Sequence, residues 1–282
     1  MPEEIITSRA NPLVRKVRRV RQGQGRELGL LLLDGPHLVE EAVAAGIPLP
    51  VILFTTAFSA RPDGRELLVR CREAARAAGQ ESELRAVIPE IIKELATTET
   101  PAGLVAVASW DLGDLGRERF WQGVSERGQS EPTFLVVADA IQDPGNLGTI
   151  FRTAAAGGAH GLVVLPGTVA PANVKVLRAS AGALFRLPWI KLGADELERS
   201  LARLGIPLYV ADARGELPYD AVDYTGPVAV AVGNEGRGPS DALHRMASGT
   251  VSIPLANQVE SLNAAVAAAI LIYEVVRQRR RL

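Results

Sequence analysis

Three segments of the chain place polar side chains, glycine and proline directly after apolar runs. They are "ADAIQDPGNLGTIFRTA" (138–154), "VGNEGRGPSD" (232–241) and "IPLANQVESLNAAVAAAILIYEVV" (253–276). The apolar runs are typical of buried strands. In parallel α/β sheets ligands bind just beyond the carboxyl ends of the strands, so we expect the functional residues in these three loops.

The first segment carries Asn146 and Arg152 on a predicted helix. A spacing of six residues puts the two side chains on roughly adjacent faces across nearly two turns, so both can point toward one end of the sheet. A turn followed by a helix with a surface arginine explains the same residues without a site.

The second segment contains Gly233, Gly236 and Gly238, which allow backbone N–H groups to approach a ligand closely. Their spacing matches neither the dinucleotide-binding pattern nor a P-loop. Glu235 would repel a phosphate, so a neutral or cationic ligand is expected at this turn. The alternative is that Glu235 is a solvated loop carboxylate.

The third segment begins a long helix rich in alanine. Ser261 is placed to cap its N-terminus, and Asn263 is predicted in the first turn, where its side chain and free N–H groups could hold a ligand. The small side chains allow the helix to pack closely against a sheet or a second subunit.

The chain is predicted to have an α/β fold with two domains. Apolar runs alternate with helical periodicity in residues 1–110, which form a small α/β domain, and again in residues 133–282. In the second region this alternation predicts a mostly parallel sheet with helices on both faces. Residues 111–132 are polar and rich in glycine, so they are predicted to be a linker.

The composition bounds the function. Apolar residues make up 47% of the 282 residues and the net charge is −1, which indicates a globular protein whose attraction to nucleic acid must come from local patches. Cys71 is the single cysteine and there are three histidines, so neither a disulfide nor a metal site is expected. No run has the length of a signal peptide or membrane span, which favours the cytoplasm.

A basic amphipathic helix is predicted near the N-terminus, in "LVRKVRR" (13–19). Its cations Arg15, Arg18 and Arg19 are candidates for RNA binding. The alternative is a solvated helix face without a partner.

Together the three segments resemble the motifs of the SpoU (TrmH-like) branch of the SPOUT methyltransferases, in the same order along the chain. The N-terminal "ITSRANPLVRKVRRVRQ" and "LLDGPHLVEEAV" resemble the substrate-binding domain of members that modify rRNA. The resemblance implies S-adenosylmethionine-dependent methylation of a ribose 2′-hydroxyl in RNA, most simply 23S rRNA. It also implies a homodimer and a trefoil-knotted catalytic domain.

The resemblance also assigns site residues. It implies a catalytic cluster of Asn146, Arg152, Glu235, Ser261 and Asn263, and cofactor contacts through the backbone at Gly233, Ile253 and Leu262. Asn257 stands where many members have glycine, and Ala264–Ala265 replace a common Val-Ser.

For Arg152 we expect an electrostatic role. A guanidinium group stays protonated near neutral pH and is a poor general base. We therefore expect Arg152 to bind the phosphate next to the target ribose and to stabilise the developing alkoxide. Two other functions stay open from the sequence: methylation of tRNA, and RNA binding or ribosome assembly without catalysis.

Overall fold

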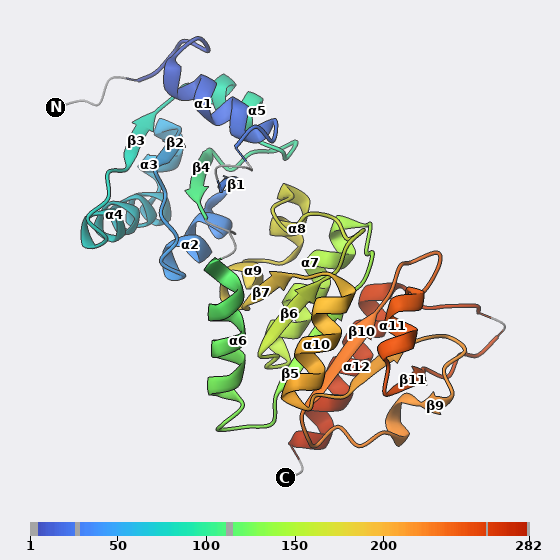
Figure 1. Ribbon diagram of the computed structural model, residues 1–282. Coiled ribbons are helices and arrows are strands. Elements are labelled where there is room, and N and C mark those ends of the chain that lie inside the picture. The colour runs from blue at the N-terminus through green and yellow to red at the C-terminus, as the bar shows by residue number, and fades with distance from the viewer. Residues whose placement is uncertain (1–4, 26–28, 111–114, 258, 281–282) are drawn as a thin grey trace. The chain divides into compact units, whose positions relative to one another are not determined.

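The computed structural model describes residues 5–25, 29–110, 115–257 and 259–280. The chain divides into two compact units, Met1–Gly113 and Asp114–Leu282 (Figure 1). Each unit has its own sheet and its own core.

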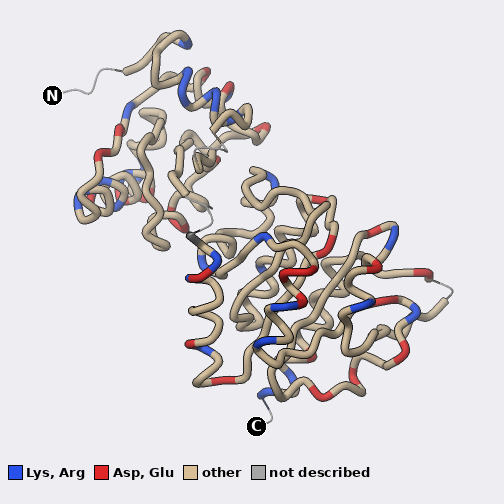
Figure 2. The backbone as a smooth tube through the Cα atoms, in the orientation of Figure 1, with Lys and Arg blue, Asp and Glu red and all other residues tan. Residues whose placement is uncertain are grey.

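The N-terminal unit has a four-stranded sheet in the order β1-β4-β2-β3, in which only β2 and β3 are parallel. Its first helix, α1, is amphipathic: Leu13, Val14, Val17 and Val20 are buried, and basic residues cover the opposite face (Figure 2). The elements are α1 (Pro12–Arg21), β1 (Leu30–Asp34), α2 (Pro36–Ala44), β2 (Val51–Phe54), α3 (Thr56–Ala60), α4 (Pro62–Ala77), β3 (Glu83–Ala86), α5 (Pro89–Leu95) and β4 (Leu104–Ser109).

The C-terminal unit is built on a seven-stranded sheet in the order β7-β6-β5-β10-β8-β11-β9, with every recorded pair parallel. Its elements are α6 (Leu115–Arg127), β5 (Phe134–Ala138), α7 (Pro144–Ala156), β6 (Gly161–Val164), α8 (Val174–Ala179), α9 (Ala183–Arg186), β7 (Trp189–Lys191), α10 (Ala194–Leu204), β8 (Leu208–Ala211), β9 (Leu217–Pro218), η2 (Tyr219–Ala221), β10 (Val228–Val232), α11 (Asp241–Met246), β11 (Gly249–Ser252) and α12 (Ala264–Arg279).

Helices cover both faces of this sheet, which confirms the predicted class. Leu135 and Val137 of β5 pack in one core with α6, α10 and α11. The opposite face is covered by α7 and α12, which contact β5 and β10 respectively. The central strands β5 and β10 are buried at every residue, as expected for parallel strands enclosed on both sides.

The structure differs from the prediction in the stretch assigned as a linker. Residues 115–127 form α6, and its Phe120 and Val124 are buried in the core of the C-terminal unit. These two side chains lie one turn apart on the same helix face. Glycines and charged residues around them obscured that short apolar pattern. Residues 111–114, also assigned to the linker, lie outside the described residues.

Phe120→Ala should therefore destabilise the C-terminal unit by about 3–5 kcal/mol, as expected when a large core side chain is lost. The ring of Phe120 packs directly on Gly161 of β6, where a Cβ would lie 2.6 Å from it. Ser125→Ala, an exposed change on the same helix, is the matched control. Urea denaturation measures the difference, and equal midpoints for the two variants would contradict this packing.

Candidate functional site

The three loops singled out in the sequence meet at the carboxyl edge of the large sheet. β5 and β10 are neighbours in register, so the loops that follow Ala138 and Val232 leave the sheet side by side. The third loop, residues 253–263, runs from β11 to α12, and α12 contacts both α7 and β10. Topology thus places together Asn146 and Glu235, which are 89 residues apart, and Asn146 and Asn263, which are 117 residues apart.

Glu235 is tied to the start of α7. Its carboxylate accepts hydrogen bonds from Asn146 Nδ2 at 2.9 Å and from the backbone N–H groups of Gln142 and Asp143, each at 3.3 Å. Burial raises the pKa of Glu235, but these hydrogen bonds and one from its own backbone outweigh it, so the pKa lies below the usual value. Glu235 is therefore an ionised acceptor that orients Asn146.

Asn146 connects Glu235 to α12. Its Oδ1 accepts a hydrogen bond from Asn263 Nδ2 at 2.9 Å, and Asn263 Oδ1 accepts from the N–H groups of Ala265 and Val266. A carboxylate can only accept and a backbone N–H can only donate, so the two ends determine how both amides are oriented. We call this chain of contacts, Glu235–Asn146–Asn263, the amide relay.

The helix cap differs from the prediction. α12 begins at Ala264 and its N-cap is Asn263, whereas Ser261 lies in the preceding loop. The predicted capping role of Ser261 is therefore wrong. An asparagine side chain accepts from the first free N–H groups of a helix as well as a serine does, and here the register of the loop selects it.

The turn after β10 is held by its own contacts. A Cβ on Gly233 would lie 2.3–2.5 Å from backbone atoms of Pro239 and Gly238, so only glycine allows the turn to close. Asn234 donates to the carbonyl of Ala140 at 2.8 Å, and Asn234 and Gly238 exchange backbone hydrogen bonds. Gly238 adopts a left-handed φ of +74°.

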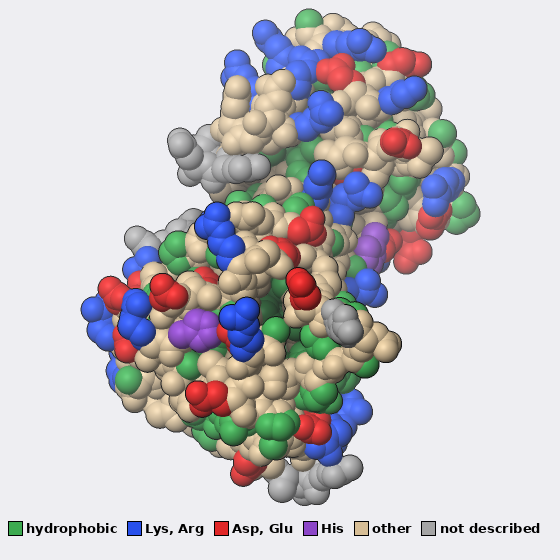
Figure 3. Space-filling model, turned by 90° about the vertical axis from the view of Figure 1, so that its right-hand side faces the viewer, with side chains coloured by type: hydrophobic (Ala, Val, Ile, Leu, Met, Phe, Trp, Pro, Cys, Tyr) green, Lys and Arg blue, Asp and Glu red, His purple; other side chains and the backbone are tan. Residues whose placement is uncertain are grey.

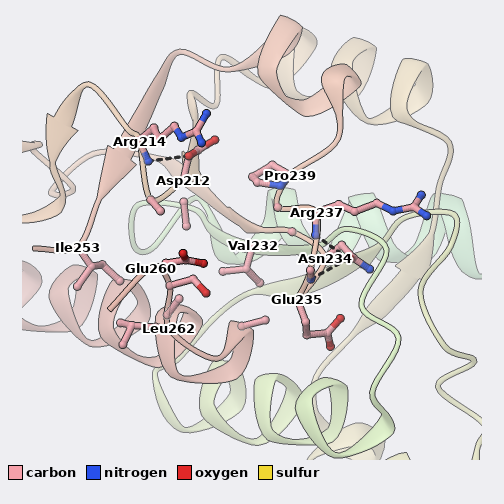
Figure 4. Close-up of a pocket in the computed structure, with 18 of the residues that line it drawn as sticks. Asp212, Arg214, Val232, Asn234, Glu235, Arg237, Pro239, Ile253, Glu260 and Leu262 are labelled. Carbon is pink, nitrogen blue, oxygen red and sulfur yellow. Dashed lines mark hydrogen bonds between the residues drawn. The ribbon is translucent and has the colours of Figure 1, made fainter. Parts of the chain in front are cut away.

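A pocket of about 720 Å³ opens beside this turn, at the ends of β8, β10 and β11 (Figures 3 and 4). Its walls include the predicted cofactor residues Gly233, Ile253 and Leu262. Ser261 and Glu235 also border it, although the Glu235 carboxylate points away toward α7 (Figure 4). The volume is that of a typical small-molecule site.

Both carboxylate and guanidinium groups border the pocket, since Arg214 and Arg237 line it together with Asp212, Glu235 and Glu260. Asp212 lies 3.3 Å from His244 Nε2 and accepts a hydrogen bond from the Arg214 N–H. Glu260 reaches into the pocket (Figure 4) and has no hydrogen bond or ion pair to the described residues. S-adenosylmethionine carries a sulfonium, an ammonium and a carboxylate group together with an aromatic adenine, whose faces are apolar. The two carboxylates and the apolar wall of Val232, Ile253 and Leu262 therefore fit it.

Arg152 lies apart from the amide relay. It is exposed on α7 and, among the residues that the structure describes, it has no hydrogen bond or ion pair and does not line the pocket. The structure therefore brings together Asn146, Glu235 and Asn263 but leaves Arg152 free to meet a ligand from solvent.

The three candidate RNA-binding arginines all lie on α1 of the N-terminal unit. Arg15 and Arg19 are exposed. Arg18 instead donates to Glu94 at 2.6 Å and to the carbonyl of Arg9, and its side chain is 28% exposed. Arg18 is thus partly neutralised by an ion pair to α5, which the sequence pattern did not indicate.

Sequence reasoning missed several residues of the site. Asn234, Asp212 and Glu260 were not singled out, although Asn234 and Glu260 lie inside the motifs. Asn257 adopts a left-handed φ of +55°, which glycine and asparagine tolerate better than other residues. This conformation explains why asparagine can stand where relatives have glycine.

Neither a metal cluster nor a membrane span is found in the described ranges. No three His, Cys, Asp or Glu side chains gather there as a metal site would require. No helix in these ranges has the length and apolar character to cross a bilayer.

Comparison with known proteins agrees with this geometry. Residues 133–273 match the model of the SpoU rRNA Methylase family, and residues 11–106 match the MRM3-like substrate binding domain. A Synechocystis protein described as an uncharacterized tRNA/rRNA methyltransferase is 34% identical over 97% of this chain and 94% of its own length. A 23S rRNA (uridine(2479)-2′-O)-methyltransferase of Streptomyces viridochromogenes is 35% identical over 89% of this chain and 84% of its own length.

Solved structures share the whole fold. The crystal structure of the SpoU methyltransferase AviRb from Streptomyces viridochromogenes with AdoMet covers 96% of this chain and 98% of its own, with a TM-score of 0.81 and 30% identity. An AdoMet-bound rRNA methyltransferase from Sinorhizobium meliloti covers 99% and 98%, with a TM-score of 0.80 and 26% identity.

The parallel sheet, its pocket at the strand ends and the preceding substrate-binding domain define a SPOUT-type methyltransferase. The chain belongs to the SpoU rRNA methylase family. It is an S-adenosylmethionine-dependent enzyme that methylates ribose 2′-hydroxyl groups of RNA.

The two glycines 233 and 236 allow a matched test of the pocket. Gly233→Ala should weaken S-adenosylmethionine binding at least about tenfold, because the new Cβ must displace the backbone of Gly238 and Pro239. Gly236→Ala should bind nearly as the wild type, since the closest atom to its Cβ is 3.7 Å away. Isothermal calorimetry measures both. Similar affinities in the two variants would show that the turn does not shape the cofactor site.

Proposed function

We propose that the protein methylates a ribose 2′-hydroxyl in 23S rRNA, with its cofactor in the pocket beside Gly233. The pocket carries this proposal, because it combines the turn after β10, the apolar contacts of Ile253 and Leu262, and the carboxylates of Asp212 and Glu260. S-adenosylmethionine, when bound, supplies the methyl group from its sulfonium. The match to the Streptomyces 23S rRNA enzyme along most of both chains supports the choice of 23S rRNA.

The residues of the chain would position the ribose and receive the charge that develops on its oxygen. The amide relay would hold the loops around the pocket in a single arrangement, since each amide in it has only one possible orientation. Arg152 would bind the adjacent phosphate and stabilise the developing alkoxide. The ribose oxygen would bond to the methyl carbon as the sulfur–carbon bond of the cofactor breaks and leaves a neutral thioether, and the hydroxyl proton would pass to solvent water.

The domain division belongs to the same proposal. The N-terminal unit, with Arg15 and Arg19 exposed on α1, would bind the RNA, while residues from 133 onward would carry out the chemistry. Methylation of rRNA would take place in the cytoplasm.

We infer that the functional form is a homodimer that pairs through α12. Val266 and Tyr273 are 48% and 50% exposed and lie seven residues apart, so they share one face of the helix. An exposed apolar stripe on a helix with alanine-rich turns is suited to close packing against a second copy. Light scattering of Val266→Glu/Tyr273→Glu should give monomers where the wild type gives dimers. A wild-type monomer at micromolar concentration contradicts the dimer.

The trefoil knot is also part of this proposal. After β11 at one side of the sheet, the chain crosses residues 253–263 and returns to pack α12 against α7 and β10 in its middle. Such a return path past the turn after β10 is what the knot of this family requires.

Mapping of ribose methylation tests the target. RNA from cells with and without the gene is compared across 23S rRNA, 16S rRNA and tRNA, and one 23S site should depend on the protein. A dependent site in tRNA alone would favour the alternative substrate, which the name of the Synechocystis relative also includes. Loss of no site would favour RNA binding without catalysis.

A further inference from the structure

The stretch between Asp143 and Asp195 contains cations but no acid. Its five charged residues are Arg152, Lys175, Arg178, Arg186 and Lys191. The chain as a whole has 31 basic and 32 acidic residues, so this stretch of about fifty residues departs strongly from the average. Solvated faces usually mix both signs, as α10 does with acidic residues toward its start and arginines toward its end, drawn red and blue in Figure 2.

The contact between α7 and α8 brings Arg152 of α7 and Arg178 of α8 near each other. A Cβ on Gly148 of α7 would lie 2.4 Å from Ala179 Cβ and 2.8 Å from the Val176 carbonyl oxygen, so the two helices are in direct contact and only glycine fits there. Arg152 follows Gly148 by one turn on nearly the same face of α7, and Arg178 is the residue before Ala179. Both arginines therefore flank one rigid contact.

Three of these cations are available to a ligand. Arg152, Lys175 and Arg178 are exposed, and none has an ion pair or hydrogen bond from its side chain to the described part of the chain. Lys175 precedes Arg178 by three residues, so both lie on one side of α8. We call these three residues the α7–α8 basic face.

The α7–α8 basic face lies at the same sheet edge as the amide relay. The loop that leads from β6 to α8 is bonded to the loop that follows β5, through Val169 N–H to the Ile141 carbonyl at 2.8 Å and Ile141 N–H to Thr168 Oγ1 at 3.2 Å. The β5 loop in turn enters α7, where Asn146 begins the relay. An RNA strand whose target ribose lies at the pocket would therefore run close to the α7–α8 basic face.

We propose that Lys175 and Arg178, together with Arg152, bind successive phosphates of the RNA strand that carries the target ribose. This inference rests on the proposed function and names the contact surface of the catalytic unit. Phosphate contacts fix the position of a strand without reading its bases. The surface would therefore hold the RNA in register while the N-terminal unit contributes further binding.

The backbone near α8 supports a constrained surface. Ala181, just after α8, has a left-handed φ of +46°, and Gly182 follows at +81°. A non-glycine residue in this region is strained, and such residues gather at functional sites. Ser180, buried between the two helices, donates its hydroxyl to the Leu177 carbonyl at 2.8 Å and closes α8.

The test compares two double variants that remove equal charge, Lys175→Ala/Arg178→Ala and the control Arg199→Ala/Arg203→Ala on exposed positions of α10. Binding to a 23S rRNA transcript is measured across a salt series. Each lost phosphate contact should lower the slope of log affinity against log salt by about 0.7, so the α8 variant should lose about 1.4 and bind roughly 10- to 30-fold more weakly at 0.1 M salt. The control should match the wild type, and S-adenosylmethionine affinity should be unchanged in both.

The outcomes separate this inference from the proposed function. If the wild type binds and methylates 23S rRNA but the α8 variant keeps its affinity and slope, the phosphate surface is wrong and the function stands. If the wild type neither binds nor methylates rRNA, both the proposed function and this inference are wrong. Lys175→Gln/Arg178→Gln, which keeps most of the side-chain length, should reproduce the loss and excludes an effect of misfolding.

Discussion

Arg152→Ala should lower the rate of methyl transfer by at least about 10²–10³-fold while S-adenosylmethionine affinity stays within about twofold of wild type. In the proposed mechanism the rate depends on a preorganised cation at the developing alkoxide, and removal of one such group typically has an effect of this size. Cofactor affinity should hold because Arg152 lies outside the pocket. Single-turnover kinetics and calorimetry measure the two quantities.

Arg152→Lys should restore little of the lost rate. An ammonium group keeps the charge but lacks the planar fork that contacts a phosphate and an oxygen together. Arg203→Ala, which removes an exposed cation from α10, is the control and should leave the rate unchanged. Near wild-type turnover in Arg152→Ala would show that Arg152 is only a surface residue of α7.

The fold was predictable where the apolar runs were long. Residues 134–138 and 228–232 are buried at every position, so their sequences predict enclosed strands directly. β9 has two exposed residues and β7 has three of mixed burial, and no period can be read from such short segments. The strand order is likewise absent from local patterns, because it depends on packing between segments far apart in the chain.

Local rules also failed where two residues competed for one role. Ser261 and Asn263 are both good helix caps, and only the path of the loop from β11 decides that Asn263 caps α12. In α6, Phe120 and Val124 supply the buried contacts, but the glycines and charges around them suggested a linker.

The site was predictable as a set of loops, but its internal contacts were not. Taken alone, each of Asn146, Glu235 and Asn263 can be explained as an ordinary turn, loop or helix-end residue without a functional site. Their shared role becomes visible only through two hydrogen bonds. One joins Asn146 to Glu235, 89 positions away, and the other joins Asn146 to Asn263, 117 positions away. Within the described part of the chain, Glu260 is the pocket carboxylate without a hydrogen bond or ion pair. Sequence reasoning instead drew attention to Glu235, whose carboxylate is hydrogen-bonded to the start of α7.

Removal of the amide relay should have the second largest effect on activity. Glu235→Ala and Asn146→Ala should each lower kcat/KM about 10²-fold, since each breaks the contacts that hold α7 and α12 around the site. The double variant should lose little more than either single one, because residues that act as one unit are not additive. Fully additive losses would show that Glu235 and Asn146 act separately.

Glu235→Gln removes the negative charge of the side chain while keeping its size and shape. The amide oxygen can still accept from Asn146, but the new NH₂ group meets the N–H of Gln142, which was bonded to the carboxylate. Two donors then face each other, so we expect a loss of about tenfold in activity, smaller than that of Glu235→Ala. Glu198→Gln, an exposed change on α10, is the matched control.

The same variant gives a stability test with a defined pH window. Because hydrogen bonds hold the pKa of Glu235 below its usual value in the folded protein, the carboxylate stabilises the fold when ionised. This contribution is complete above the unfolded pKa of a glutamate, about 4.3, and is lost as the pH falls through the lowered folded pKa. The difference in unfolding free energy between wild type and Glu235→Gln should therefore be constant from pH 7 to about 5 and shrink below that. A difference that is flat down to the acid limit of the folded protein would mean that the ionised carboxylate does not hold the relay.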